Sequence, residues 1–369
     1  MKTMVIILKR DYRRVHFILL LLLLLVAAFN TFNIIQIYDL KKPVIEIKPL
    51  ERDITLTIIT PANCDECTDL IQMADYVEQL GVVFSSKEVL SQYEGESLIN
   101  KHGIKRLPAI IIKGHSPTLD QMFNRTETGY LFDEPYPPYA DIDGKIYGVV
   151  SAVIINDSCS ECSGVRNVLL SMQTVYKVYI SSETAIDSSS EDGQRLLEHY
   201  NITKVPTIIL SEDALEYEVI EQSWLDIGTI ETDGKLVLRE VLPPYHDLID
   251  NEVKGLTNAI YLTDSSCTDC FDVTTLKPIL TENFGIALTN EVTYDTSSDN
   301  GKRLIQSYSI TTVPTIILSQ DAQYYKAIEV GWESLGTIEN DGMYVLRNLN
   351  VFPQITYKNV ITGELNSTF

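Results

Sequence analysis

All six cysteines of this chain lie in three Cys-x-x-Cys pairs, and each pair is followed at nearly the same distance by an apolar residue and a proline. The pairs are Cys64 and Cys67, Cys159 and Cys162, and Cys267 and Cys270. The prolines are Pro108, Pro206 and Pro314, which follow the first cysteine of their pair by 44, 47 and 47 residues. Unselected cysteine usage does not give this arrangement, so the pattern predicts a function that needs two neighbouring sulfur atoms.

The pairs belong to a longer internal repeat. Residues 159–239 align with residues 267–347 at a constant offset of 108 without a gap, and the two tryptophans of the chain, Trp224 and Trp332, correspond in this alignment. A period of about 100 residues is the size of a domain rather than of a solenoid repeat. We therefore expect three tandem domains, each able to bury its own core, at 52–146, 147–254 and 255–350, followed by a C-terminal tail at 351–369.

The N-terminus has a different composition. Residues 15–37 contain no Asp, Glu, Lys or Arg, and this stretch is long enough to cross a bilayer, since about 20 apolar residues suffice. We expect a transmembrane signal-anchor there, between a cytoplasmic segment at 1–14 and a linker at 38–51. A cleaved signal peptide that ends at Val26-Ala27-Ala28 is the alternative.

The distribution of charge indicates the orientation of the chain in the membrane and argues against some classes of partner. A basic cluster precedes the apolar stretch and favours an N-terminus inside and domains outside the cell membrane; it consists of Lys9, Arg10, Arg13 and Arg14. The net charge of −22 argues against nucleic acid and against anionic membrane surfaces as partners.

Local patterns alternate between strand and helix, which is typical of an α/β domain with helices on a sheet. In the second unit we expect a strand at 152–156, a helix after Cys162 with Val165, Leu169 and Met172 on one face, a strand at 177–181, a helix at 191–200 and a strand after Pro206. The first and third units repeat this order, from 54–60 to 109–114 and from 258–262 to 315–319.

The other parts of the repeat are less regular. We interpret the tryptophan-containing segments as further strands that turn at the Asp-Gly steps 233–234 and 341–342. The segments PPYAD at 137–141 and PPYHD at 243–247 are interpreted as connectors between domains.

The order of strand, CxxC, helix, strand, helix, proline and strand resembles the thioredoxin fold, three times over and across most of the chain after residue 52. The resemblance implies that Pro108, Pro206 and Pro314 are cis-prolines that face the cysteines. It also implies that the preceding residues offer backbone groups to an extended substrate in a groove; these residues are Leu107, Val205 and Val313.

The resemblance further implies the roles of the cysteines. The first cysteine of each pair sits at a helix N-terminus, where free N–H groups and the helix dipole favour the thiolate that attacks a substrate disulfide; these are Cys64, Cys159 and Cys267. The second resolves the mixed disulfide; these are Cys67, Cys162 and Cys270. The expected activity is thiol–disulfide exchange on secreted or surface proteins by a membrane-anchored oxidoreductase, without a cofactor or a metal.

Two alternatives remain open. A CxxC pair in an extracytoplasmic domain can be a static disulfide in a surface module that binds partners without catalysis. Two CxxC pairs can also form a four-thiolate zinc site, although here the pairs lie in separate domains. A cysteine–histidine hydrolase fits poorly, because no histidine recurs at a fixed spacing from the cysteines.

The chain departs from the thioredoxin pattern beside the cysteines. No aromatic residue precedes the first cysteine, and an acid precedes the second in each pair. A nearby negative charge destabilises a thiolate, so we expect these acids to tune the pKa of the pair; they are Glu66, Glu161 and Asp269.

Replacing Glu161 with Gln should therefore lower the pKa of the reduced Cys159 thiol and make the second unit more oxidising. A tenfold change in acidity corresponds to about 1.4 kcal/mol, or on the order of 30 mV for a two-electron couple. Thiolate absorbance against pH and the equilibrium with glutathione, measured for both forms, check this. A Cys159 pKa that stays unchanged or rises would contradict a redox role for the acids.

Overall fold

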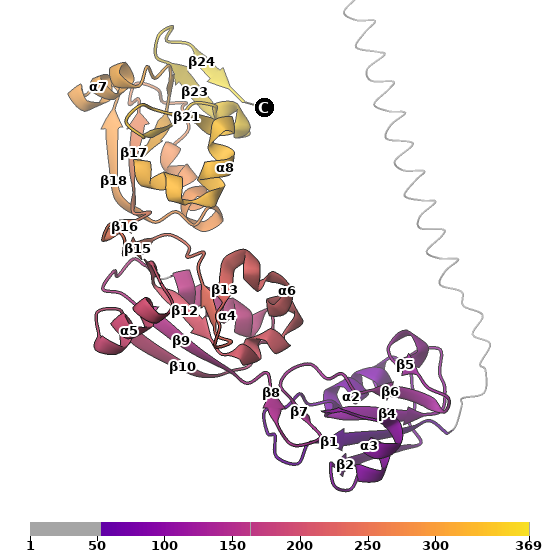
Figure 1. The fold of residues 1–369 in the computed structure, drawn as a ribbon. Coiled ribbons are helices and arrows are strands. Elements are labelled where there is room, and N and C mark those ends of the chain that lie inside the picture. The colour runs from indigo at the N-terminus through magenta and orange to yellow at the C-terminus, as the bar shows by residue number, and fades with distance from the viewer. Residues whose placement is uncertain (1–52, 163, 369) are drawn as a thin grey trace, which may run out of the picture.

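The computed structural model describes residues 53–162 and 164–368, which form three α/β units that follow one another along the molecule (Figure 1). Each unit contains a five-stranded mixed sheet with helices on its faces and a separate three-stranded sheet. The repetition agrees with the three CxxC repeats of the sequence.

In the first unit the main sheet has the order β2-β1-β4-β6-β5. Strand β2 is parallel to β1, and the other pairs are antiparallel. Its strands are β1 (Thr55–Thr60), β2 (Ser86–Ser91), β4 (Ala109–Lys113), β5 (Asn124–Arg125) and β6 (Gly129–Phe132), and its helices are α2 (Ile71–Gln79), α3 (Glu96–His102) and the 3-10 turn η1 (Leu119–Gln121). The small sheet consists of β3 (Arg106–Leu107), β7 (Tyr139–Asp141) and β8 (Ile146–Tyr147).

The second unit has the corresponding order β10-β9-β12-β14-β13. Its strands are β9 (Val150–Asn156), β10 (Ile180–Asp187), β12 (Thr207–Leu210), β13 (Gly228–Ile230) and β14 (Leu236–Leu238), and its helices are α4 (Gly164–Thr174), α5 (Glu191–His199), η2 (Glu212–Glu216) and α6 (Glu218–Ile227). Its small sheet consists of β11 (Lys204–Val205), β15 (Tyr245–Asp247) and β16 (Glu252–Lys254).

The third unit has the order β18-β17-β20-β22-β21. Its strands are β17 (Thr257–Thr263), β18 (Leu288–Asp295), β20 (Thr315–Leu318), β21 (Gly336–Ile338) and β22 (Tyr344–Leu346). Its helical elements are α7 (Asp299–Ser307), α8 (Lys326–Leu335), the 3-10 turns η3 (Val273–Leu276), η5 (Gln320–Tyr324) and η6 (Leu349–Val351), and the π-helix η4 (Ile279–Asn283). Its small sheet consists of β19 (Thr312–Val313), β23 (Thr356–Asn359) and β24 (Leu365–Ser367).

The central strand of each unit is apolar on both faces because helices cover both. In the second unit, Ile154 packs with Leu169 and Trp224 in one core cluster, whereas its neighbour Ile155 packs with Leu197 in another. Successive side chains of a strand point to opposite faces, so a continuous apolar run is what a doubly covered strand requires. The strand therefore has little freedom to shift, and the loop that follows it is held in place.

The structure corrects the interpretation of the tryptophan-containing segments. Both begin as helices, α6 and α8, in which Trp224 and Trp332 are buried (1% and 2% exposed). Each indole N–H donates to a carbonyl in the strand that follows, at 3.0 and 3.1 Å. The expected Asp-Gly turns at 233–234 and 341–342 do join the next two strands of each unit.

Two further expectations are corrected. The strand expected at 177–181 begins at Ile180, because Lys177 has a left-handed φ of 58° that no strand residue adopts. Residues 351–369, expected as a tail, contribute β23 and β24 to the third unit. Phe352 and Tyr357 of this segment pack against the core of the unit.

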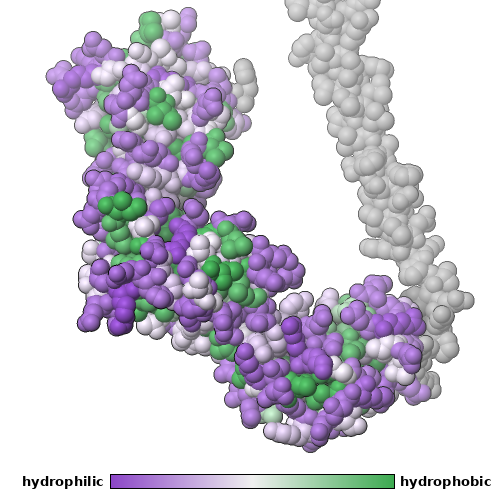
Figure 2. Space-filling model, viewed as in Figure 1, coloured by the Kyte–Doolittle hydropathy of each residue, from purple (hydrophilic) through white to green (hydrophobic). Residues whose placement is uncertain are grey.

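Phe352 also marks a difference between the second and third units. It lies in a small apolar groove of about 70 Å³ beside Trp332. The corresponding groove of the second unit, beside Trp224, is open and measures about 310 Å³. Figure 2 shows hydrophobic residues gathered on this part of the second unit within a mainly hydrophilic surface.

The predicted membrane segment cannot be located in this fold. Among the residues that the structure describes, no helix combines the length and the apolar character needed to cross a membrane. The expected signal-anchor at 15–37 lies outside these residues, as do the segments at 1–14 and 38–51.

Candidate disulfide-exchange site

Each CxxC pair forms a disulfide in the loop that follows the central strand of its unit. The Cα–Cα distances are 5.4 Å for Cys64–Cys67, 5.3 Å for Cys159–Cys162 and 5.4 Å for Cys267–Cys270. The first cysteine of each pair is half-buried, so it is neither sealed in the core nor fully open to solvent.

Sheet register brings the proline step next to each of these loops. The peptide bonds before Pro108, Pro206 and Pro314 are cis. The residue after each proline pairs with the end of the central strand, as Ala109 does with Ile59. The same pairing joins Thr207 to Ile155 and Thr315 to Leu262. The cysteines and prolines singled out in the sequence therefore lie at the same end of each sheet.

The helices begin later than the resemblance implied. Helix α2 starts at Ile71, beyond Cys67, and the third unit starts its 3-10 turn at Val273, beyond Cys270. An aspartate five residues after the first cysteine accounts for this: Asp69 accepts from the Ile71 N–H and Asp272 from the Thr274 N–H. Asp272 is the N-cap of its turn, whereas Asp69 precedes the N-cap Leu70 and forms a local Asx turn before the helix. Because a helix dipole acts only near its first turn, its effect on the first cysteine is weaker than expected.

The strand before each proline is paired within the chain. Leu107 pairs with Ala140, Val205 with His246 and Val313 with Lys358. The partner strands β7, β15 and β23 each form a hairpin with the next strand, β8, β16 or β24. The segments 137–141 and 243–247, interpreted as connectors, thus contain hairpin strands. Leu107, Val205 and Val313 are fully buried, and the edge expected to offer backbone groups to a substrate is occupied by the hairpin.

The hairpins also contact the CxxC loops. The Thr68 N–H, directly after Cys67, donates to Pro138 O at 2.9 Å. The Phe271 N–H, directly after Cys270, donates to Thr356 O at 2.9 Å. Each of these hairpins therefore bridges the cysteine loop and the proline strand.

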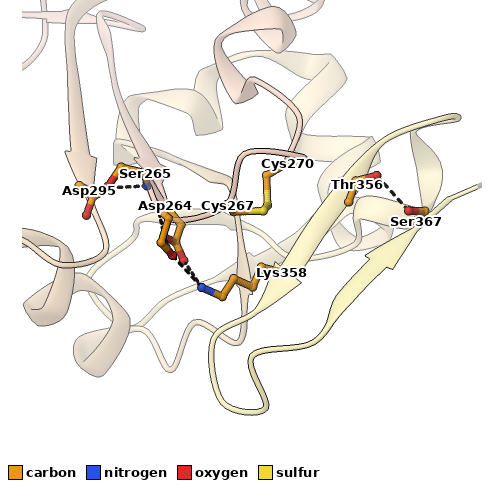
Figure 3. The surroundings of a disulfide bond; sticks show 9 residues. Asp264, Ser265, Cys267, Cys270, Asp295, Thr356, Lys358 and Ser367 are labelled. Carbon is orange, nitrogen blue, oxygen red and sulfur yellow. Dashed lines mark hydrogen bonds and ion pairs between the residues drawn. A yellow bond between two sulfur atoms is a disulfide. The ribbon is translucent and has the colours of Figure 1, made fainter.

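In the second and third units, side chains also link the hairpin to the residues just before the first cysteine. We call these side-chain pairs the bridging pairs. In the second unit His246 Nδ1 lies 2.8 Å from Asp157 Oδ2. In the third unit Lys358 Nζ donates to Asp264 Oδ2 at 2.8 Å and to Ser266 Oγ at 3.0 Å. Figure 3 shows this pair beside the Cys267–Cys270 disulfide. The corresponding positions of the first unit, by strand register, are the uncharged Pro61 and Ala140.

The bridging pairs are well shielded from solvent. Asp264 exposes 9% of its side chain and Asp157 exposes 10%. Burial of the Asp264 carboxyl opposes its ionisation, but the hydrogen bonds from Lys358 and Ser266 outweigh burial and hold its pKa below the ordinary value. Asp264 is thus a carboxylate three residues before Cys267, with Lys358 as its counter-charge.

The acids between the cysteines are more exposed to solvent than the bridging pairs. Glu66, Glu161 and Asp269 are all exposed, and water and salt screen such charges strongly. The Asp264–Lys358 ion pair, which is mostly shielded from water, acts in a medium of lower dielectric constant. Asp157, His246, Asp264 and Lys358 are therefore the electrostatic residues that sequence reasoning missed. The signal that could have found two of them is the aspartate that directly follows the central strand in the second and third units.

No metal site is formed by these groups. Within residues 53–162 and 164–368, no cluster of three or more His, Cys, Asp or Glu side chains could hold a metal ion.

No protein-family model and no curated protein matches this chain. Among solved structures it is similar to ERdj5 in crystal form II, at 12% identity over 75% of this chain and 39% of that one, with a TM-score of 0.15. Human ERp44 in its zinc-bound form is similar at 10% identity over 72% and 78%, with a TM-score of 0.15. A mutant of the alkylhydroperoxide reductase component AhpF from Enterococcus faecalis is similar at 17% identity over 46% and 81%, with a TM-score of 0.16.

The chain spans about two fifths of the length of ERdj5. At these TM-scores the likeness carries no argument about activity. The resemblance to the thioredoxin fold rests instead on the repeated sheet order, the CxxC loops and the proline strands.

Replacing Lys358 with Met should raise the pKa of the reduced Cys267 thiol, because it leaves the Asp264 carboxylate without its counter-charge. At neutral pH the alkylation of Cys267 should slow about threefold, since the thiolate is the reacting form. Alkylation rates followed by peptide mass spectrometry separate Cys267 from the other cysteines. Lys326→Met is the matched control, because Lys326 is 80% exposed and its ion pair with Glu329 lies at the surface. Unchanged or faster alkylation in Lys358→Met would contradict the electrostatic role.

Proposed function

We propose that this protein is a membrane-anchored thiol–disulfide oxidoreductase that acts on extracytoplasmic proteins. The observation that carries the proposal is the threefold placement of a half-buried CxxC disulfide in the loop beside a proline strand. A disulfide that only stabilises a fold has no need of that position in every unit.

The reaction uses two sulfur atoms in turn. In the reducing direction the thiolate of Cys64, Cys159 or Cys267 attacks one sulfur of a substrate disulfide, forms a mixed disulfide and releases the other substrate sulfur as a thiolate, which takes up a proton. The second cysteine, as a thiolate, then attacks the first cysteine's sulfur and releases the second substrate thiol. The pair is oxidised by two electrons and the substrate disulfide is reduced by two. Oxidation of substrates runs the same steps in reverse.

A non-enzymatic surface module is the second candidate. The observation that favours it is the pairing of Leu107, Val205 and Val313 with hairpins, which leaves these residues no free backbone groups for a partner. In such a module the three disulfides only hold their loops. The two candidates differ in whether the disulfides exchange in the native state.

Exchange should be reversible without unfolding. In a glutathione titration of the full chain, each pair should change between disulfide and dithiol while the circular dichroism of the sheets is retained. The variants Cys64→Ser, Cys159→Ser and Cys267→Ser should each remove one exchanging site. Cys67→Ser, Cys162→Ser and Cys270→Ser should instead accumulate mixed disulfides, because the resolving sulfur is missing. Cysteines that stay resistant to alkylation after dithiothreitol treatment of the native protein would favour the surface module.

The membrane location has its own test. Residues 15–37 should hold the chain in the bilayer, so protease added to intact cells should digest residues 45 onward and leave the N-terminal segment protected. A mature N-terminus at Phe29 would instead show that a signal peptide is cleaved and would contradict the anchor.

A further inference from the structure

The sheet edge beside each disulfide is paired with a hairpin strand of the same chain. Exposed strand edges bind extended peptides by adding them as a further strand. The edge nearest the CxxC loop belongs to the strand before the proline, β3, β11 or β19. In all three units an antiparallel hairpin strand already pairs with that edge, opposite Leu107, Val205 and Val313.

The hairpin is fixed from the other side as well. Backbone bonds from Thr68 and Phe271 reach the first and third hairpins. The bridging pairs Asp157–His246 and Asp264–Lys358 hold the second and third. In Figure 3, β23 and β24 lie alongside the Cys267–Cys270 loop. An extended polypeptide cannot add to this edge while the hairpin is in place, since each backbone group there already has its partner.

The first cysteine of each pair is less enclosed than the strand residue before the proline. Cys64, Cys159 and Cys267 keep part of their surface exposed. A small thiol or disulfide needs only the sulfur atom, whereas an extended polypeptide needs the strand edge to gain affinity.

We propose that the three hairpins select the reactants of the site. Small disulfides and thiols exchange with the hairpin closed, and extended polypeptide disulfides exchange only when the hairpin opens. The proposal rests on the proposed exchange activity and deepens it by assigning its substrate class. The chemical step is unchanged: one thiolate attacks, one thiolate leaves, and two electrons pass between the pair and the reactant.

The hairpin turns offer a way to loosen the hairpin. The turn residue Gly144 lines a pocket with Pro61, Ala62 and Asn63, directly before Cys64, so the small-probe rate serves as the control for a direct effect on the loop. Gly144 and Gly363 lie in the turns of the first and third hairpins at φ of +88° and +75°, with open space around them. Valine strains such a backbone. Gly81 and Gly285 are matched controls in the same two units, since their φ values are +92° and +68°, they also face open space, and they lie outside the hairpins.

Two probes with the same reacting bond separate the reactant classes. One is the mixed disulfide of thionitrobenzoate with free cysteine, and the other carries the same mixed disulfide at the central cysteine of an extended synthetic peptide. The reduced full chain is mixed with each probe, and differential alkylation with peptide mass spectrometry gives the rate at every CxxC pair.

The unmodified chain should react with the peptide no faster than with the small probe. In Gly144→Val the peptide rate at Cys64 should rise about tenfold while the small-probe rate stays within about twofold, because the strain favours the open hairpin. Gly363→Val should do the same at Cys267. Gly81→Val and Gly285→Val should leave both rates unchanged.

A ratio of peptide to small-probe rate that does not move in the turn variants overturns the hairpin proposal and leaves the exchange activity intact. Failure of every pair to react with either probe overturns the proposed function itself.

A second measurement does not depend on the turn variants folding. Cys67→Ser in the full chain traps Cys64 in a mixed disulfide with either the peptide or free cysteine. Residues 139–147 should lose protection from hydrogen exchange only in the peptide adduct. Equal protection in the two adducts overturns the proposal.

Discussion

The antiparallel pairing between the strand before the proline and the following hairpin sets the surroundings of each CxxC loop. It consumes the backbone groups of Leu107, Val205 and Val313 and places the hairpin against the cysteine loop. The first two hairpins also lead directly into the next unit. The Gly148 and Gly255 carbonyls after them accept from Tyr217 and Tyr325 of that unit at 2.8 and 2.7 Å. One short element therefore contacts both a CxxC loop and the next unit.

The three sites share a scaffold but differ in local charge. The second and third units place a carboxylate and a basic side chain, both mostly shielded from water, beside the first cysteine. The first unit has Pro61 and Ala140 instead. Because shielded charges affect a neighbouring thiolate more strongly than exposed ones, the bridging pairs can separate the reduction potentials of units whose CxxC motifs look alike. The exposed acids inside the motifs are common to all three and cannot distinguish them.

Much of the scaffold was predictable from local sequence because doubly covered strands need continuous apolar runs, as at Ile154 and Ile155. The cysteine–proline spacing also indicated which loops meet. The hairpins were not predictable in this way. Val205 and His246 pair across a long stretch of chain, and the Pro-Pro-Tyr steps resemble a connector because proline supplies no N–H to a sheet. The residue types of the Asx turn at Asp69 and the cap at Asp272 were visible in the sequence, but the resemblance implied that the helices start at the cysteines.

Access to the first two sites is coupled to the arrangement of the units. Tyr139 of the first hairpin donates to Glu216 of the second unit at 2.5 Å and stacks on Tyr147. Tyr245 of the second hairpin packs edge-on against Tyr324 of the third. Any opening of these hairpins breaks contacts between units, and by linkage any force or ligand that changes the angle between units changes the cost of opening. In the part of the chain that the structure describes, the third hairpin makes its hydrogen bonds within its own unit. Opening of the third hairpin therefore breaks contacts within its own unit, whereas opening of the first or second hairpin also breaks contacts with the next unit.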